Sequence, residues 1–231
     1  MKVTQNFSIA VAALSFASLA VAAPLHDDKY GFDITFPDGW TVLSPGEPII
    51  FAGLSPDGAS RANCAATAQN VELTGGLTQS QLNEGLRNPF GKAFWEGSIF
   101  KSGTEIVIET DGVRDHPSGV VAQEAVASLD VGTAGVPSRA RMVVTILITP
   151  GRTYSVTCAT KVDHFDPYRT AFRKVADSLR IGAQTNANTV QNLDPSGVTA
   201  TPVSTDAVLP ELFSAANGAA SAVAWEHAPV R

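Results

Sequence analysis

The strongest constraint on the fold of this 231-residue chain comes from two long segments of strand-forming residues, 139–149 and 153–160, separated by Pro150-Gly151. Strands joined by so short a turn pair with each other, which predicts an antiparallel hairpin. A strand that is apolar on both faces is covered on both sides, so we predict that the first segment is central in its sheet. Its two faces carry Met142, Val144, Ile146 and Ile148 on one side, and Val143, Thr145 and Leu147 on the other.

Strand-type sequence recurs elsewhere in the chain. It is found at residues 31–36, 40–43, 49–54, 61–67, 105–109 and 120–129. The turn sequence Pro37-Asp38-Gly39 lies between the first two of these segments and predicts a second hairpin. Asp111-Gly112 is also a typical turn pair, and it predicts that the strand at 105–109 ends before it.

Two regions have the spacing of helices. Residues 79–96 are expected to form one or two helices, because Thr78 and Gln81 have the form of a capping box and Asn88-Pro89 resembles a second helix start. A later helix is predicted to start with Asp166 as its N-cap and Pro167 as its first residue. Its apolar stripe, which is expected to lie on the sheet, consists of Tyr168, Phe172, Val175, Ala176 and Leu179.

The two ends of the chain differ in character from its centre. Residues 9–21 form a short apolar run after Met1-Lys2, and Ala20-Val21-Ala22 has the form of a signal-peptidase site. We therefore expect a signal peptide at 1–22, a short segment at 23–29, a domain at 30–181 and a mostly disordered tail at 182–231. The run is too short to span a bilayer, so the mature chain is expected to be periplasmic or extracellular and not membrane-spanning.

Cys64 and Cys158 both lie in strand-type sequence. An exported chain meets an oxidising compartment, so we predict a disulfide between them. Strand alternation places Cys158 on one face with Tyr154 and Val156, and both thiols can point into the same core. Two buried free thiols are the alternative.

The order of these elements resembles the PsbP/DcrB-like (Mog-type) superfamily. The resemblance rests on the opening Phe36-Pro37-Asp38-Gly39-Trp40 and on the strand bearing Tyr154 before the last helix, and it covers about 30–181. It implies an α+β sandwich, with an antiparallel sheet of about six to seven strands and helices packed on its faces. The superfamily includes a photosystem subunit, a Ran-binding protein and bacterial envelope proteins, so it implies a fold without a function and supplies no catalytic residue.

The charge and the motifs of the chain exclude several classes of function. The chain has 16 basic and 22 acidic residues, a net charge of -6 and no basic cluster, so we predict no nucleic-acid partner. It contains no G-x-S-x-G, H-E-x-x-H, G-x-G-x-x-G or P-loop motif, and its candidate acid–base groups, His116 and His164, fall in a turn and at a helix entrance. We therefore predict no catalytic residue, no metal site and no cofactor.

The resulting prediction is a non-catalytic binding or accessory module of the cell envelope, whose partner is a protein or a small ligand. An assembly factor acting through its tail and an unrecognised enzyme are the alternatives, and no oligomeric state is indicated. Phe90, Phe94 and Trp95 are the predicted binding surface, because aromatic side chains are common anchors of binding sites. The alternative is that these three rings simply cover the sheet.

Overall fold

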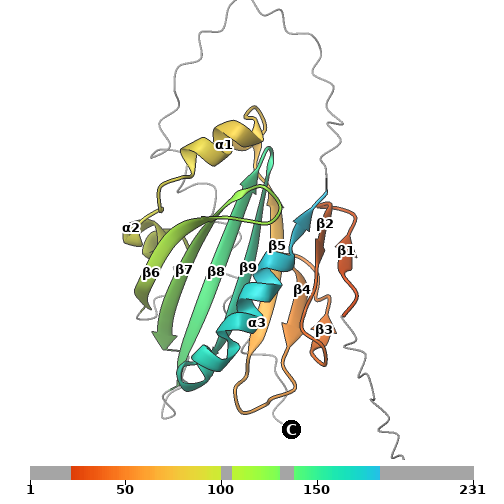
Figure 1. The fold of residues 1–231 in the computed structure, drawn as a ribbon, viewed down its shortest axis with the longest axis vertical. Helices are drawn as coiled ribbons and strands as arrows, with labels where there is room; N and C mark the ends of the chain where they lie inside the picture. Colours follow the sequence, from red (N-terminus) through yellow and green to blue (C-terminus); the bar gives the residue numbers. More distant parts are fainter. Residues whose placement is uncertain (1–21, 100–105, 131–137, 183–231) are drawn as a thin grey trace, which may run out of the picture.

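The computed structural model describes residues 22–99, 106–130 and 138–182, which form two antiparallel sheets and three short helices (Figure 1). The larger sheet has seven strands in the order β3-β4-β5-β9-β8-β7-β6, and the smaller has the order β1-β2-β10. This architecture confirms the predicted α+β fold with an antiparallel sheet of six to seven strands. The predicted signal peptide and tail lie outside the described residues, except for Ala22 and Gly182, and no helix within these ranges is long and apolar enough to cross a bilayer.

The elements have the following bounds. The strands are β1 (Leu25–Asp27), β2 (Phe32–Ile34), β3 (Thr41–Leu43), β4 (Ile49–Leu54), β5 (Asn63–Asn70), β6 (Ile106–Asp115), β7 (Val121–Asp130), β8 (Arg139–Thr149), β9 (Arg152–Lys161) and β10 (Arg180–Ile181). The α-helices are α1 (Gln79–Gly85), α2 (Lys92–Phe94) and α3 (Phe165–Ser178). Two short 3-10 helices, η1 (Glu72–Thr74) and η3 (Val162–His164), and one π-helical segment, η2 (Trp95–Ile99), accompany them.

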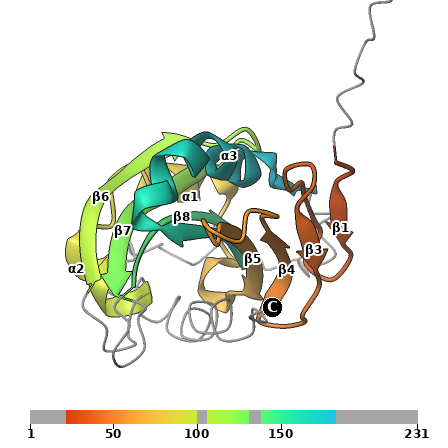
Figure 2. The same ribbon diagram turned by 90° about the horizontal axis from the view of Figure 1, so that it is seen from below.

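The β8–β9 hairpin is the centre of the larger sheet, as its sequence predicts. β8 pairs with β7 on its other side, and β9 pairs with β5. One face of the sheet packs against α3 and β2, and the other against α1 and the aromatic residues of 90–95. Figure 2 shows α3 and α2 on opposite sides of the curved sheet. Burial on both sides explains why β8 is apolar at consecutive positions.

The predicted hairpin between 31–36 and 40–43 is wrong, because its two strands belong to different sheets. β2 pairs with β1 and β10, whereas β3 pairs with β4. The turn after Phe36 carries the chain from the small sheet to the large one, and the Phe36 ring packs on Gly53 of β4. A Cβ at Gly53 would lie 2.3 Å from Phe36 Cδ1, so this contact requires glycine. The smaller sheet is therefore held against the core by side chains, and β1 adds to it from the segment 23–29.

Two further predicted boundaries are wrong. β6 continues through Asp111-Gly112 because a bulge between Ile108 and Thr110 absorbs the irregularity, and Gly112 pairs with Glu124. Helix α3 begins at Phe165, with His164 in the N-cap position, rather than at Pro167. Proline is accepted there because the first-turn N–H groups have no intrahelical partner.

The helical start at Asn88-Pro89 is also wrong, since α2 begins at Lys92 after Gly91, whose φ is +81°. By contrast, the capping box of Thr78 and Gln81 is confirmed at the start of α1.

The predicted disulfide is present. Cys64 and Cys158 face each other directly in the β5–β9 register, their Cα atoms are 4.0 Å apart, and both side chains are buried in the core beneath α3. The bridge joins positions 94 residues apart and ties the β4–β5 half of the sheet to the central hairpin.

Replacing both cysteines with alanine should lower the free energy of unfolding by about 4 to 5 kcal/mol, because a long loop is no longer closed in the unfolded chain. Urea unfolding followed by circular dichroism measures the change. A loss below about 1 kcal/mol, or two titratable thiols in the unfolded and unreduced wild type, would contradict this.

His116 joins the end of α3 to the β6–β7 turn. Its Nε2 donates to the carbonyl of Ala176 at 2.9 Å, so Nδ1 is the acceptor for the hydroxyl and the N–H of Ser118, at 2.6 and 3.2 Å. The ring is buried, and burial lowers its pKa below 6.5, with the nearby Arg114 and Arg180 adding to the effect. The Ala176 carbonyl and Asp177 act in the opposite direction without reversing it.

A lowered pKa means that the unfolded chain takes up a proton that the folded chain excludes. The stabilisation from neutral His116 is therefore complete above pH 6.5, and it declines as the pH falls from 6.5 through the lowered pKa. We expect His116→Gln, which keeps a donor near Ala176, to show a weaker loss of stability over this range than the wild type. The measurement is urea unfolding at several pH values, and equal slopes for the two proteins would refute the assignment. The pKa of His26 is raised chiefly by its hydrogen bond to Asp33. Because both proteins contain His26, its contribution to the pH dependence cancels when the wild type and His116→Gln are compared.

Candidate functional site

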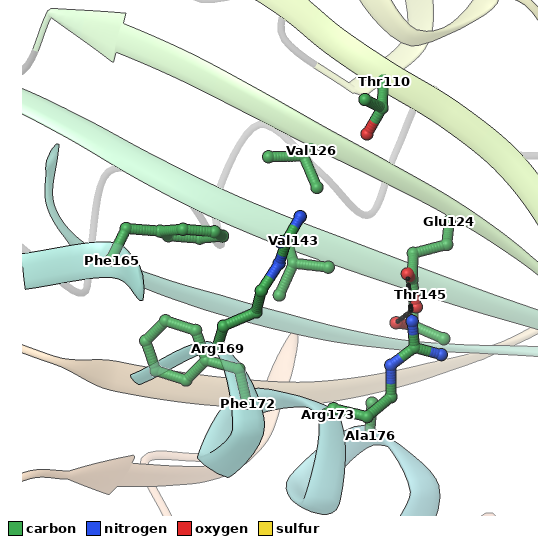
Figure 3. Close-up of a pocket in the computed structure, with 10 residues that line it drawn as sticks. All are labelled: Thr110, Glu124, Val126, Val143, Thr145, Phe165, Arg169, Phe172, Arg173 and Ala176. Atoms are coloured by element: carbon green, nitrogen blue, oxygen red, sulfur yellow. Dashed lines mark hydrogen bonds and ion pairs between the residues drawn. The ribbon is translucent and has the colours of Figure 1, made fainter. Parts of the chain in front are cut away.

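A cleft opens between α3 and the edge of the larger sheet. Helix α3 packs on β8, β9 and β2, and it leaves the β6–β7 part of the same face uncovered (Figure 1). The cleft has a volume of about 150 Å³. Its walls come from β6, β7, β8 and α3: Thr110, Glu124, Val126, Val143, Thr145, Phe165, Arg169, Phe172, Arg173 and Ala176 (Figure 3).

The spacing of α3 explains how one helix supplies both the apolar and the charged parts of this wall. Phe165, Phe172 and Ala176 are buried against the sheet. Arg169 and Arg173 are exposed, and they follow Phe165 at intervals of four residues, along the margin of the same stripe. Residues at this spacing lie one above another on a helix, so both arginines line the cleft from α3.

At one end of the cleft, Glu124 of β7 accepts bonds from two arginines. Arg114 Nε lies 3.1 Å from Glu124 Oε2, and Arg173 Nη2 lies 2.9 Å from Oε1. The Thr145 hydroxyl adds a bond to Oε2 at 3.3 Å, and Arg114 also pairs with Asp177 of α3 at 2.7 Å. These contacts attach the C-terminal half of α3 to the sheet and satisfy both oxygens of the Glu124 carboxylate.

At the other end of the cleft, beside Phe165, Arg141 of β8 forms a second group of ion pairs. Its guanidinium lies 4.5 Å from the centroid of the Phe165 ring and pairs with Glu109, which also accepts from Ser128. A second carboxylate, that of Asp166, lies 3.7 Å from Arg141, measured from Oδ1 to Nη1. Burial of the Glu109 carboxylate opposes its ionisation, but the bonds from Ser128 and Arg141 outweigh burial and lower its pKa. Glu109 is therefore ionised at neutral pH.

Arg169 stands between these two groups of ion pairs. It lines the cleft together with Val143, and in the view of Figure 3 its side chain lies between Phe165 and Glu124. Among the residues that the structure describes, it has no carboxylate partner, whereas Arg114, Arg141 and Arg173 each have at least one. The cleft thus offers one uncompensated cation above an apolar surface.

The predicted aromatic surface lies on the opposite face of the sheet, away from this cleft. The Phe90 and Phe94 ring centroids are 4.2 Å apart, and Trp95 lies within 6 Å of both. Trp95 is fully buried in the second core, while Phe90 and Phe94 are partly buried against it. Gln123 holds the segment to β7: its Oε1 accepts from Phe90 N–H, and its Nε2 donates to the carbonyls of Leu86 and Asn88.

The candidate acid–base groups are not brought to either place. His116 is buried against Ser118 and Ala176, and His164 lies at the entrance of α3. In the described part of the chain, no group of three or more His, Cys, Asp or Glu side chains is arranged to hold a metal ion.

The sequence did not predict the cleft because its charged residues are far apart in the chain: Glu124 and Arg173 are separated by 49 positions. The one local signal was the pair Arg169 and Arg173 on a helix whose remaining stripe is apolar.

The chain was compared with protein families, with curated proteins and with solved structures. No protein-family model matches the chain, and no curated protein matches it. It is similar to PsbP (CyanoP) from Synechocystis sp. PCC 6803, at 15% identity and a TM-score of 0.47, over 74% of this chain and 98% of that one. It is also similar to LpqN, a protein involved in cell envelope biogenesis of Mycobacterium tuberculosis, at 12% identity and a TM-score of 0.44, over 68% and 88% of the two chains.

Replacing Trp95 with alanine should destabilise the domain by roughly 3 to 5 kcal/mol, because a fully buried ring leaves a cavity. Trp40→Ala is the matched control and should cost less, since its ring is only partly buried. Urea unfolding of both variants tests this. A loss at Trp95 no larger than the loss at Trp40 would show that Trp95 is not a core residue.

Proposed function

We propose that this protein is an exported, non-catalytic binding module of the cell envelope, and that the cleft beside α3 receives a small ligand. The observation that carries the proposal is the cleft itself, a preformed cavity with an apolar floor and charged side chains fixed by ion pairs. Binding sites of small molecules are usually concave and apolar, with a few positioned polar groups. The buried disulfide supports the export part of the proposal, because such bridges persist in oxidising compartments.

The polar groups that line the cleft favour binding over catalysis, because most of them already form ion pairs or hydrogen bonds with the protein. A general base needs a free lone pair within reach of substrate, and bonds from Arg114, Arg173 and Thr145 already take up three of the four lone pairs of Glu124. The described histidines do not line the cleft. What the cleft mainly offers is an apolar surface and the Arg169 cation, which together can hold a molecule.

Phe90 and Phe94 are proposed as a second surface, for a partner protein. Partly exposed neighbouring rings are typical of interface anchors, and Gln123 fixes the backbone of Phe90 to the sheet. The alternative, an assembly factor acting through 182–231, concerns residues outside those described apart from Gly182.

The cleft proposal predicts that molecules of one-ring size perturb the methyl groups of its floor. We would titrate benzoate, benzyl alcohol and benzylamine separately into the full chain and follow the methyl resonances of Val126 and Val143 by NMR. At least one probe should shift these resonances with saturation. Thr110→Trp should abolish the shifts, because this exposed position lies in the cleft wall and a large ring there fills the space.

Thr41→Trp is the matched control, since Thr41 is an exposed strand residue of β3 that does not line the cleft. It should leave the shifts unchanged. If no probe moves the two valines, or if Thr110→Trp binds as well as the wild type while folded, the cleft is not a binding site.

A further inference from the structure

We infer that the ligand class of the α3 cleft is an organic monoanion, a single carboxylate on a compact apolar body, with Arg169 as its counter-ion. The inference rests on the proposed function and adds the chemistry of the ligand. It follows from three properties of the cleft: a guanidinium with no carboxylate partner among the described residues, an apolar floor, and a lining that contains two arginines and one glutamate.

The unpaired guanidinium supplies the recognition group. Four arginines surround the cleft, and three of them are held by Glu124, Glu109, Asp177 or Asp166. Only the fourth, Arg169, lacks a carboxylate among the described residues. A guanidinium presents a planar fork of N–H donors that matches the two oxygens of a carboxylate. A carboxylate ligand would therefore form with Arg169 the kind of ion pair that the other three arginines already form with protein carboxylates.

The floor supplies the apolar part of the site. Val126, Phe165 and Phe172 are buried, and Val143, which lines the same cleft as Arg169, is partly buried. A cavity of roughly 150 Å³ accommodates one benzene ring. An apolar body of that size removes surface from water at about 25 cal/mol per Å², which a small inorganic anion cannot do.

The charge balance favours a monoanion over a dianion. The cleft is lined by two arginines and one glutamate, on a chain whose net charge is -6. Because Glu124 remains in the wall, a second negative charge on the ligand would face a carboxylate rather than a donor. Phosphate would also need several converging N–H groups, and Arg173 is already engaged with Glu124.

The test compares probes that share a ring and differ in charge. Benzoate, benzyl alcohol, benzylamine and inorganic phosphate are titrated at pH 7 and low salt into wild type, Arg169→Gln and Arg87→Gln, with the Val126 and Val143 methyl resonances as the readout. Arg87 is the matched control, because it is an exposed arginine that does not line the cleft. We expect benzoate to bind most tightly to the wild type, and to be weakened about 10-fold or more by Arg169→Gln but not by Arg87→Gln, since a bond to a charged group is worth about 1.5 to 3 kcal/mol.

The outcomes separate this inference from the proposed function. If benzyl alcohol binds as tightly as benzoate, or if Arg169→Gln leaves benzoate affinity unchanged, the cleft binds ligands but the monoanion assignment is wrong. If phosphate binds more tightly than benzoate, the ligand class is an inorganic or phosphoryl anion and the assignment is again wrong. Failure of every probe would overturn the proposed function as well.

Discussion

The packing of α3 across the β8–β9 half of the larger sheet is the interaction on which the rest of the structure depends. Phe165, Phe172 and Leu179 are fully buried along this contact, opposite Tyr154 and Val156 of β9. Each buried side chain of this size contributes roughly 1.5 to 3 kcal/mol. Strand β10 follows directly after α3 in the chain and pairs with β2, so the position of α3 also places the third strand of the smaller sheet. Because the helix is centred on β8 and β9, the β6–β7 side of the face is left open, and the cleft is a consequence of that offset.

The charged groups around the cleft matter more for geometry than for stability. Ion pairs near the surface contribute little, with a typical range of 0 to 1 kcal/mol, because water and salt screen them. Their effect is to fix Glu124, Arg173 and Arg141 in position, so that Arg169 is the arginine of the cleft lining that has no carboxylate partner among the described residues. Arg169 is exposed before binding, so its desolvation occurs when a ligand covers it, and the expected affinity is modest and dependent on salt.

Much of the fold could be predicted from the sequence where the signal was local or periodic. The β8–β9 hairpin followed from two apolar faces and a short turn, the start of α1 from Thr78 and Gln81, and the bridge from two cysteines in strand-type sequence. The errors arose where tertiary contacts overrode local signals. Pro37-Asp38-Gly39 turns the chain between sheets rather than within one, and Asp111-Gly112 is accommodated inside β6 by a bulge. The cleft could not be predicted, since the register of β7 beside β8 and the offset of α3 decide which charges remain unpaired.

The most direct measurement of the central claim is a crystal structure of the protein grown or soaked with benzoate. The account predicts that the carboxylate lies within hydrogen-bond distance of the Arg169 guanidinium, with the ring over Val126 and Val143 and with the bonds of Glu124 to Arg114 and Arg173 unchanged. Benzoate found only at other sites, with water in the cleft at full occupancy, would contradict it.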